Sequence, residues 1–162
     1  MLIREANNAD LPGILAIYND VVANTTAIYE DRPSTLEERQ AWMDERRAQG
    51  WPVLVADVDG QVAGFSTFGP WRSRWGYRFT VEHSVHVHPD YRGKGIGRAL
   101  IEALFPRAVD LGMHVMIAQI DAEATASLRL HSRLGFRTVG TFHEVAFKFG
   151  RWLDLVVMER RV

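Results

Sequence analysis

One segment near the middle of the chain constrains the fold more than any other, because an apolar strand pattern runs directly into a basic, glycine-rich turn that opens a helix. The segment reads Val85-His86-Val87-His88-Pro89-Asp90-Tyr91-Arg92-Gly93-Lys94-Gly95-Ile96-Gly97-Arg98. Three glycines at every second position let a ligand approach the backbone, and the first N–H groups of the helix point at that ligand. Because helix N-termini bind anions, the segment predicts a phosphate or pyrophosphate site.

The glycine spacing separates this turn from two common phosphate-binding motifs. A P-loop has Ser or Thr after its Gly-Lys, whereas Lys94 is followed by Gly95, so no hydroxyl is available for magnesium. A dinucleotide fingerprint has G-x-G-x-x-G order, whereas the glycines here alternate. An ordinary turn that uses glycine for conformation alone is the remaining alternative. An anion would explain the positive charge at the helix start, where the macrodipole disfavours it. The basic residues are Arg92, Lys94 and Arg98.

Length and composition fit one globular domain, residues 1–162. Of these residues 47% are hydrophobic and 24% are charged, which is an ordinary balance. The formal net charge of −1 argues against a general surface for nucleic acid or anionic membrane, so neither is a predicted partner. No apolar run approaches the ~18 residues needed to span a bilayer, and the first residues lack a signal-peptide core. The expected location is the cytoplasm.

The chain contains no cysteine, which excludes a disulfide framework, a thiolate metal site and an acyl-cysteine intermediate. Three histidines, His83, His86 and His88, lie on one predicted strand and its end, with no second group of ligands nearby in the sequence. The two-residue period of a strand directs His83 and His86 to opposite faces. No metal site is therefore predicted.

Hydrophobic periodicity predicts strands and helices that follow one another along the whole chain. Helices are expected at about residues 10–22, 34–50, 95–111 and 125–134, and Pro106 is expected to bend the third helix or end it early. Strands are expected at about residues 2–5, 52–58, 61–68, 78–87, 114–120, 136–145 and 152–159. Asp59-Gly60 is a hairpin turn signal. The order predicts a mixed α/β sheet, antiparallel first and parallel around the glycine turn.

The pattern Arg92-x-x-Gly95-x-Gly97, preceded by Val-x-Pro and followed by an amphipathic helix, resembles the acetyl-CoA signature of the GCN5-related N-acetyltransferase (GNAT) family. Other segments, which cover nearly the whole chain, resemble the branch of that family that acetylates phosphinothricin and methionine sulfoximine. These segments are Gly69-Pro70-Trp71-Arg72, Thr80-Val81-Glu82-His83-Ser84-Val85, Ser127-x-x-x-His131-x-x-Leu134-Gly135-Phe136 and Lys148-Phe149-Gly150-Arg151-Trp152-Leu153-Asp154.

The resemblance implies a mostly antiparallel sheet with flanking helices, in which the strands around Val85 and Val115 splay apart and admit the pantetheine arm of acetyl-CoA. It implies that the backbone from Val85 to Val87 pairs with the pantetheine amides. The implied cofactor-binding residues are Val85, His86, Val87, Arg92, Gly93, Lys94, Gly95, Ile96, Gly97, Arg98 and Ser127. Ala124 stands where the related pattern has asparagine, so we expect weaker cofactor binding without loss of activity.

Acetyl transfer to an amine needs a base for the amine and a proton for the departing thiolate. Strand alternation turns Glu82 away from Val81 and Val85, so its carboxylate faces either solvent or a site. Its place on the strand that leads to the glycine turn favours a general base acting through water. In many family members a tyrosine protonates the thiolate at the position of His131, and imidazole can do the same. A surface or structural histidine is the alternative.

The segment Trp71-Arg72-Ser73-Arg74-Trp75 pairs guanidinium groups with aromatic rings. Arginine binds carboxylates in bidentate fashion, and rings can enclose the apolar part of a small substrate. A protein-binding or dimer surface is the alternative. The predicted substrate-binding residues are Tyr29, Glu30, Arg72, Ser73, Arg74, Glu82, His83, Ser84 and Lys148.

Together these features favour an N-acetyltransferase that acts on the α-amino group of a small amino acid or analogue. Methionine sulfoximine, methionine sulfone and phosphinothricin are the expected analogues. Because cysteine is absent, direct transfer in a ternary complex is the simplest mechanism. The alternatives are acetylation of protein N-termini or lysines, and a regulatory module that binds acyl-CoA without turnover. The aromatic content also favours a homodimer.

Overall fold

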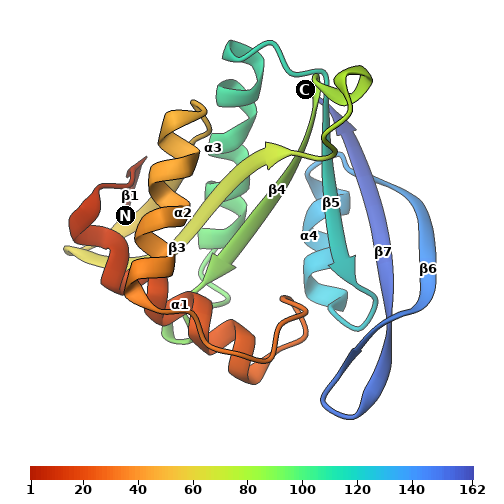
Figure 1. The fold of residues 1–162 in the computed structure, drawn as a ribbon, viewed down its shortest axis with the longest axis horizontal. Coiled ribbons are helices and arrows are strands. Elements are labelled where there is room, and N and C mark those ends of the chain that lie inside the picture. Colours follow the sequence, from red (N-terminus) through yellow and green to blue (C-terminus); the bar gives the residue numbers. More distant parts are fainter.

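Seven strands form one continuous sheet in the computed structural model, which describes residues 1–162 (Figure 1). In spatial order the strands are β1 (Leu2–Glu5), β2 (Val53–Val58), β3 (Gln61–Pro70), β4 (Thr80–Val87), β5 (Val115–Asp121), β7 (Arg151–Arg161) and β6 (Arg137–Lys148). All neighbours pair antiparallel except β4 and β5, which are parallel. The predicted mixed, mostly antiparallel sheet is confirmed.

Four helices cover the two faces of the sheet (Figure 1). They are α1 (Leu11–Asn24), α2 (Leu36–Ala48), α3 (Ile96–Asp110) and α4 (Thr125–Arg133). Short 3-10 turns occupy Asn8–Asp10, Trp75–Tyr77 and Pro89–Tyr91. Helix α2 begins after Thr35, whose side chain accepts a hydrogen bond from the Glu38 N–H and so caps the helix.

Helix α3 does not end at Pro106 but continues to Asp110, so the early end considered for this helix is wrong. Pro106 is exposed, and its missing N–H leaves the carbonyl of Glu102 free on the solvent side of the helix. Leu104 and Ala108 are fully buried on either side of it, and their packing holds the helix together.

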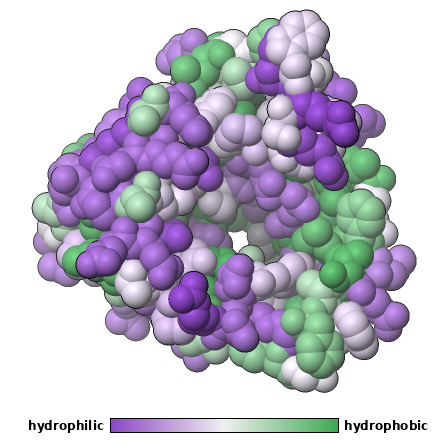
Figure 2. Space-filling model, in the orientation of Figure 1, coloured by the Kyte–Doolittle hydropathy of each residue, from purple (hydrophilic) through white to green (hydrophobic).

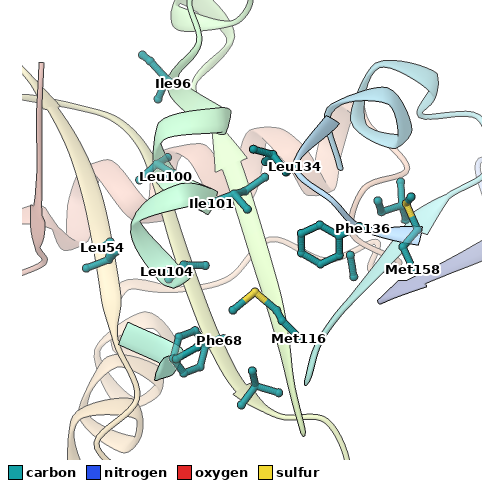
Figure 3. Packing of buried hydrophobic residues seen from close by; sticks show 14 of the residues in the cluster. Leu54, Phe68, Ile96, Leu100, Ile101, Leu104, Met116, Leu134, Phe136 and Met158 are labelled. Carbon is teal, nitrogen blue, oxygen red and sulfur yellow. The ribbon is translucent and has the colours of Figure 1, made fainter. Parts of the chain in front are cut away.

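Two buried clusters form the core, one on each face of the sheet. The larger cluster joins α3 and α4 to the sheet, and Figure 3 shows Leu100, Ile101 and Leu104 of α3 packing near Phe68 and Met116. The smaller cluster joins α1 and α2 to β2 and β3 on the other face. These clusters fix the helices against the sheet, and so fix the loops at its centre.

The parallel pair of strands is hydrogen-bonded over a short length only. The register joins Thr80 to Val115, Val81 to Met116 and Glu82 to Ile117, and no pair follows. Beyond this point β4 stays paired with β3, and β5 stays paired with β7. Two strand edges therefore face each other without bonding, and Figure 2 shows an opening in the middle of this face. The divergence expected for these strands is present, and it begins after Val115 itself has paired.

Candidate functional site

A cavity of about 250 Å³ lies where β4 and β5 diverge. Both strands, α4 and the loop between α1 and α2 form its walls. Its lining includes Ala27, Ile28, Glu82, His83, Ser84, Val85, His86, Gln119, Asp121, Ala124, Ser127 and His131. The structure therefore brings together seven residues that the sequence predicts for catalysis, substrate or cofactor, five on the strand that leads to the glycine turn and two on α4.

Strand alternation distributes these side chains over both faces of the sheet. Glu82 lies opposite Gly69 of β3, on the face that α1 and α2 cover. His86 is on the same face, because its ring packs against Phe65 with centroids 5.4 Å apart. His83 points to the other face and meets His131 of α4. The opening between β4 and β5 connects the side chains on one face with those on the other.

The Glu82 carboxyl is half-buried, and burial raises its pKa above the ordinary value. A hydrogen bond from Gln119 and the positive charge of Arg46 act in the opposite direction and lower it. Glu82 thus combines a desolvated carboxyl group with two neighbours that stabilise its ionised form.

Arg46 of α2 reaches the sheet beside Glu82. Its Nη1 is buried and has no hydrogen-bond partner, and burial lowers the pKa of the guanidinium. A Cβ on Gly69 would lie 2.2 Å from this Nη1, so a side chain at this position would displace the guanidinium from its present place. No sequence signal singles out Arg46, because α2 carries many charged residues.

The rings of His83 and His131 form a buried pair. Their Nε2 atoms are 3.0 Å apart, and the rings stack with centroids 5.0 Å apart. Nδ1 of His131 lies 2.8 Å from the backbone oxygen of Ser127. Burial lowers the pKa of His83 to about 3 and also lowers the pKa of His131, so both rings are neutral near pH 7.

The glycine turn is open to a ligand at the start of α3. Gly93 and Gly95 have φ angles of 75° and 80°, and nothing lies within 4 Å of a Cβ built on either residue. Gly95 is the N-cap of α3 and provides no side-chain cap, so the first N–H groups of the helix are available to an anion. Ala124, the N-cap of α4, also provides no side-chain hydrogen bond.

The predicted basic residues around this turn are exposed and have contacts within the chain. Arg92 pairs with Asp20 at 3.2 Å, and its Nε donates to the Val87 oxygen. The Lys94 ammonium donates to the Asp90 oxygen, and Arg98 pairs with a glutamate one helical turn later. The positive charge at the helix start is thus partly neutralised.

A second cavity, of about 370 Å³, lies beside the loop between β3 and β4. It is mostly apolar and contains one charged side chain, that of Arg72, which lies 4.6 Å above the Trp71 ring. Its lining is Trp71, Arg72, Gln119, Val139, Gly140, Thr141, Phe142 and Val157. Gln119 lines both cavities. Ser73 and Arg74 are exposed and line neither.

Tyr29, Glu30 and Lys148 line a third cavity, on the other side of the loop between α1 and α2. The Lys148 ammonium donates to three backbone oxygens, of Val22, Thr25 and Ile28, at 2.8, 2.7 and 2.7 Å. All three of its donors are used within the chain.

Asp121 of β5 fixes the same loop from the cavity side. It accepts hydrogen bonds from the Thr26 hydroxyl at 2.7 Å and from the Tyr29 hydroxyl at 2.9 Å. Burial and this hydrogen bond raise the pKa of Tyr29. Asp121 and Lys148 therefore anchor the loop that carries Ala27 and Ile28 over the central cavity.

A family model described as the Acetyltransferase (GNAT) family matches residues 14–136. The chain belongs to this family. The resemblance seen in the sequence is confirmed, and this GNAT protein is an acetyl-CoA-dependent acetyltransferase.

Named relatives extend over nearly the whole GNAT chain. An L-methionine sulfoximine/L-methionine sulfone acetyltransferase of Pseudomonas aeruginosa is 55% identical and covers 97% of this chain and 92% of its own. A phosphinothricin N-acetyltransferase of Alcaligenes faecalis is 40% identical over 98% of this chain and 81% of its own. A putative acetyltransferase of Salmonella typhimurium, solved with its cofactor acetyl-CoA, has a TM-score of 0.97 at 47% identity, with 99% and 93% of the two chains covered.

The open strand edges and the glycine turn of this GNAT protein fit acetyl-CoA. Unpaired backbone groups on β4 and β5 can bond the amides of an extended arm as an added strand would. No helix is long and apolar enough to cross a membrane. The structure also contains no group of side chains suited to hold a metal ion.

Proposed function

We propose that the enzyme transfers the acetyl group of acetyl-CoA to the α-amino group of a small amino acid or analogue. Methionine sulfoximine, methionine sulfone and phosphinothricin are the analogues we favour, because similar enzymes carry these names. The observation that carries the proposal is the meeting of two cavities at Gln119, one beside the Glu82 carboxyl and one beside the Arg72 guanidinium. An amino group and a carboxylate of one small molecule can be bound there together.

The proposed cofactor site combines the strand edge of β4 with the glycine turn. When bound, acetyl-CoA supplies the acetyl group as a thioester that an amine can attack directly. The backbone from Val85 to Val87 would bind the pantetheine arm, and residues 92–98 with the start of α3 would bind the diphosphate. Ser127 of α4 lines the same cavity and completes this set.

Within this site we assign the role of general base to Glu82. Its raised pKa makes the carboxylate a better proton acceptor near neutral pH, and the cavity leaves room for a water molecule between it and the amine. His131 is assigned a part in delivering a proton to the departing thiolate. Direct attack without an acyl-enzyme follows from the absence of cysteine.

The Arg72 cavity is our proposed site for the rest of the substrate. Its guanidinium would bind the carboxylate in bidentate fashion, and the walls formed by Phe142 and Val157 would contact the apolar part of the side chain. Ser73 and Arg74 lie on the same loop, and Ser84 lines the central cavity with Glu82. Tyr29, Glu30 and Lys148 lie at the loop between α1 and α2, which forms one wall of the central cavity.

A thiol-release screen tests this function. Purified enzyme with acetyl-CoA is incubated with amino acids, their sulfoximines and sulfones, phosphinothricin, peptides and polyamines, and products are identified by mass spectrometry. We expect CoA release and an N-acetylated product with the small amino-acid analogues. Release with peptides alone would favour the protein-acetylating alternative. Acetyl-CoA binding without release from any amine would favour the regulatory module.

The variant Glu82→Gln tests the assignment of the base. Removal of a general base costs about 10²–10⁴-fold in turnover, so kcat should fall by that order. Glutamine keeps the size of the side chain, so acetyl-CoA affinity, measured by calorimetry, should not change. Unchanged turnover across the pH range would remove Glu82 from the mechanism.

We also infer that residues 1–162 act as one catalytic domain in the cytoplasm, where acetyl-CoA is made, and that two copies pair. The pairing is inferred from β6, an edge strand whose side chains are almost all exposed. Phe142, Val145, Phe147 and Trp152 on the β6–β7 hairpin are 55, 52, 60 and 62% exposed. Figure 2 shows hydrophobic residues along the edge of the molecule where β6 lies.

A further inference from the structure

The buried imidazoles of His83 and His131 have a defined arrangement of protons. Nδ1 of His131 lies 2.8 Å from a backbone oxygen, that of Ser127, and a carbonyl oxygen only accepts. Nδ1 of His131 therefore carries the proton. In a neutral ring this leaves Nε2 of His131 as an acceptor.

The arrangement in His131 determines the arrangement in His83. The two Nε2 atoms are 3.0 Å apart, and a hydrogen bond between them needs one proton. Since Nε2 of His131 accepts, Nε2 of His83 donates. Nδ1 of His83 is then a bare acceptor, and it is buried without any hydrogen-bond partner in the protein.

This arrangement bears on the proton that the CoA sulfur must receive. Both ring nitrogens of His131 are bonded within the protein, so neutral His131 has no proton to give at Nε2. Nδ1 of His83 is the ring nitrogen of the pair that stays without a partner, and His83 lines the central cavity. A proton can therefore be added to the pair at this atom without breaking a hydrogen bond within the protein.

We propose that His83 and His131 act together as a neutral relay, which takes up a proton at Nδ1 of His83 and holds the positive charge on His131. This proposal rests on the proposed function. Glu82 takes, through water, the proton that makes the amine neutral. As the neutral amine attacks, its nitrogen loses its second proton to Nδ1 of His83, and the Nε2 proton of His83 passes to Nε2 of His131. When the carbon–sulfur bond breaks, both transfers reverse and the thiolate receives the proton from Nδ1 of His83. One proton leaves nitrogen and one reaches sulfur, so the step is balanced.

The surroundings of His131 suit it to hold the charge. Its Nδ1–H stays bonded to the Ser127 oxygen in both states. It lies in the last turn of α4, where the helix dipole stabilises a positive side chain. His83 lies on a strand, away from any helix terminus, and burial lowers its pKa to about 3. The charge is therefore more stable on His131 than on His83.

Histidine tautomers in the free enzyme test the resting state independently of activity. With ¹⁵N-labelled histidine near pH 7, we expect His131 to be protonated at Nδ1 and His83 at Nε2, with both rings neutral. The variants His83→Gln and His131→Gln assign the signals. A proton on Nε2 of neutral His131, or a charged ring in the resting pair, would overturn the relay. This result does not depend on which amine the enzyme acetylates, so it separates a failed relay from a failed function.

Kinetics of His83→Gln test the relay itself. The glutamine amide can still donate to Nε2 of His131, but it cannot take up a proton and pass it on. We expect kcat to fall about a hundredfold, with the KM for acetyl-CoA and the His131 tautomer unchanged. The matched control is His114→Gln, an exposed histidine just before β5, and it should keep the kcat of the unaltered enzyme. Unchanged kcat in His83→Gln would refute the relay and leave His83 as a packing residue.

Discussion

Three effects of its surroundings determine the pKa of Glu82, and they can be separated. Burial disfavours the charged carboxylate, while Gln119 and Arg46 favour it. The net effect of these is a raised pKa, so burial is the strongest of them. Arg46 acts on Glu82 through its charge, and its Nη1 forms no hydrogen bond. Its effect on the pKa of Glu82 can therefore be removed without breaking a hydrogen bond at Nη1.

The variant Arg46→Gln should move the acidic side of the pH profile. The positive charge of Arg46 lowers the pKa of Glu82, so its removal raises that pKa further. A base with a higher pKa becomes protonated at a higher pH, and kcat/KM should therefore begin to fall at a higher pH in the variant. Initial rates over a pH series measure this limb.

The matched control for Arg46→Gln is Arg47→Gln on the same helix. The Arg47 guanidinium donates hydrogen bonds to the Asn8 side chain and to the Ala6 oxygen, between β1 and α1. The Arg47→Gln substitution removes the same charge, but Arg47 has no neighbouring carboxylate in the site. The pH profile of this variant should therefore match that of the unaltered enzyme. Identical profiles for both variants would contradict a role for Arg46.

The glycine turn before α3 gives a prediction about cofactor binding. Gly95 has a φ of 80°, where a side chain costs about 1–2 kcal/mol, and an added Cβ would stand at the opening of the helix N-terminus. We expect Gly95→Ala to weaken acetyl-CoA binding about tenfold, which corresponds to ~1.4 kcal/mol. Calorimetric titration with acetyl-CoA measures the change.

Gly60→Ala is the matched control for this turn. Gly60 also has a φ of 80° and no atom within 4 Å of a built Cβ, but it lies in the β2–β3 hairpin. Both variants should lower the melting temperature similarly, and only Gly95→Ala should lose affinity. Equal affinity in the two variants would show that the N-terminus of α3 does not bind the cofactor.

The secondary-structure elements differ in whether a local sequence signal predicts them. The glycine turn, the Asp59-Gly60 hairpin and the periodic helices were predictable, because their signals are local. The β6–β7 hairpin is longer than predicted, since its turn places Phe149 at a φ of 52°, and phenylalanine carries no turn signal. Register shifts in β6, with Glu144 at a φ of 53°, also conceal its alternation.

The candidate site was predictable where one strand determines it and not where distant elements meet. The period of two placed Glu82 and His83 on opposite faces, as the structure has them. The contact of His83 with His131 joins residues 48 positions apart, and Arg46 reaches Gly69 from another helix. Only the packing of α2 and α4 on the sheet creates these contacts. Lys148 was predicted for substrate, and its three backbone bonds instead anchor a loop.

The molecule as a whole offers a route for direct transfer, because one opening connects both faces of the sheet between β4 and β5. An amine bound from the α1 and α2 face can meet a thioester between the strands, and no cysteine is present to carry the acetyl group. Initial rates with both substrates varied should therefore give intersecting lines in double-reciprocal plots. Parallel lines, with exchange of acetyl between CoA molecules in the absence of amine, would indicate an acyl-enzyme instead.

Pairing of two chains is the prediction that concerns the outer surface. Phe147 and Trp152 pack edge to face with ring centroids 5.0 Å apart, yet each is about 60% exposed, on a hairpin at the edge of the sheet. A stable interface buries about 1,200–2,000 Å² in total, which the long β6–β7 hairpin can supply in a symmetric pair. Sedimentation should show a dimer. The double variant Phe147→Glu, Trp152→Glu should run as a monomer, because a two-fold axis brings the added charges of both copies together. Val109→Glu places the same charge on an apolar side chain of α3 that is 58% exposed, and it should stay dimeric. If the unaltered chain sediments as a monomer, or if the double variant keeps the dimer mass, the hairpin is not the interface and its aromatic side chains face solvent for another reason.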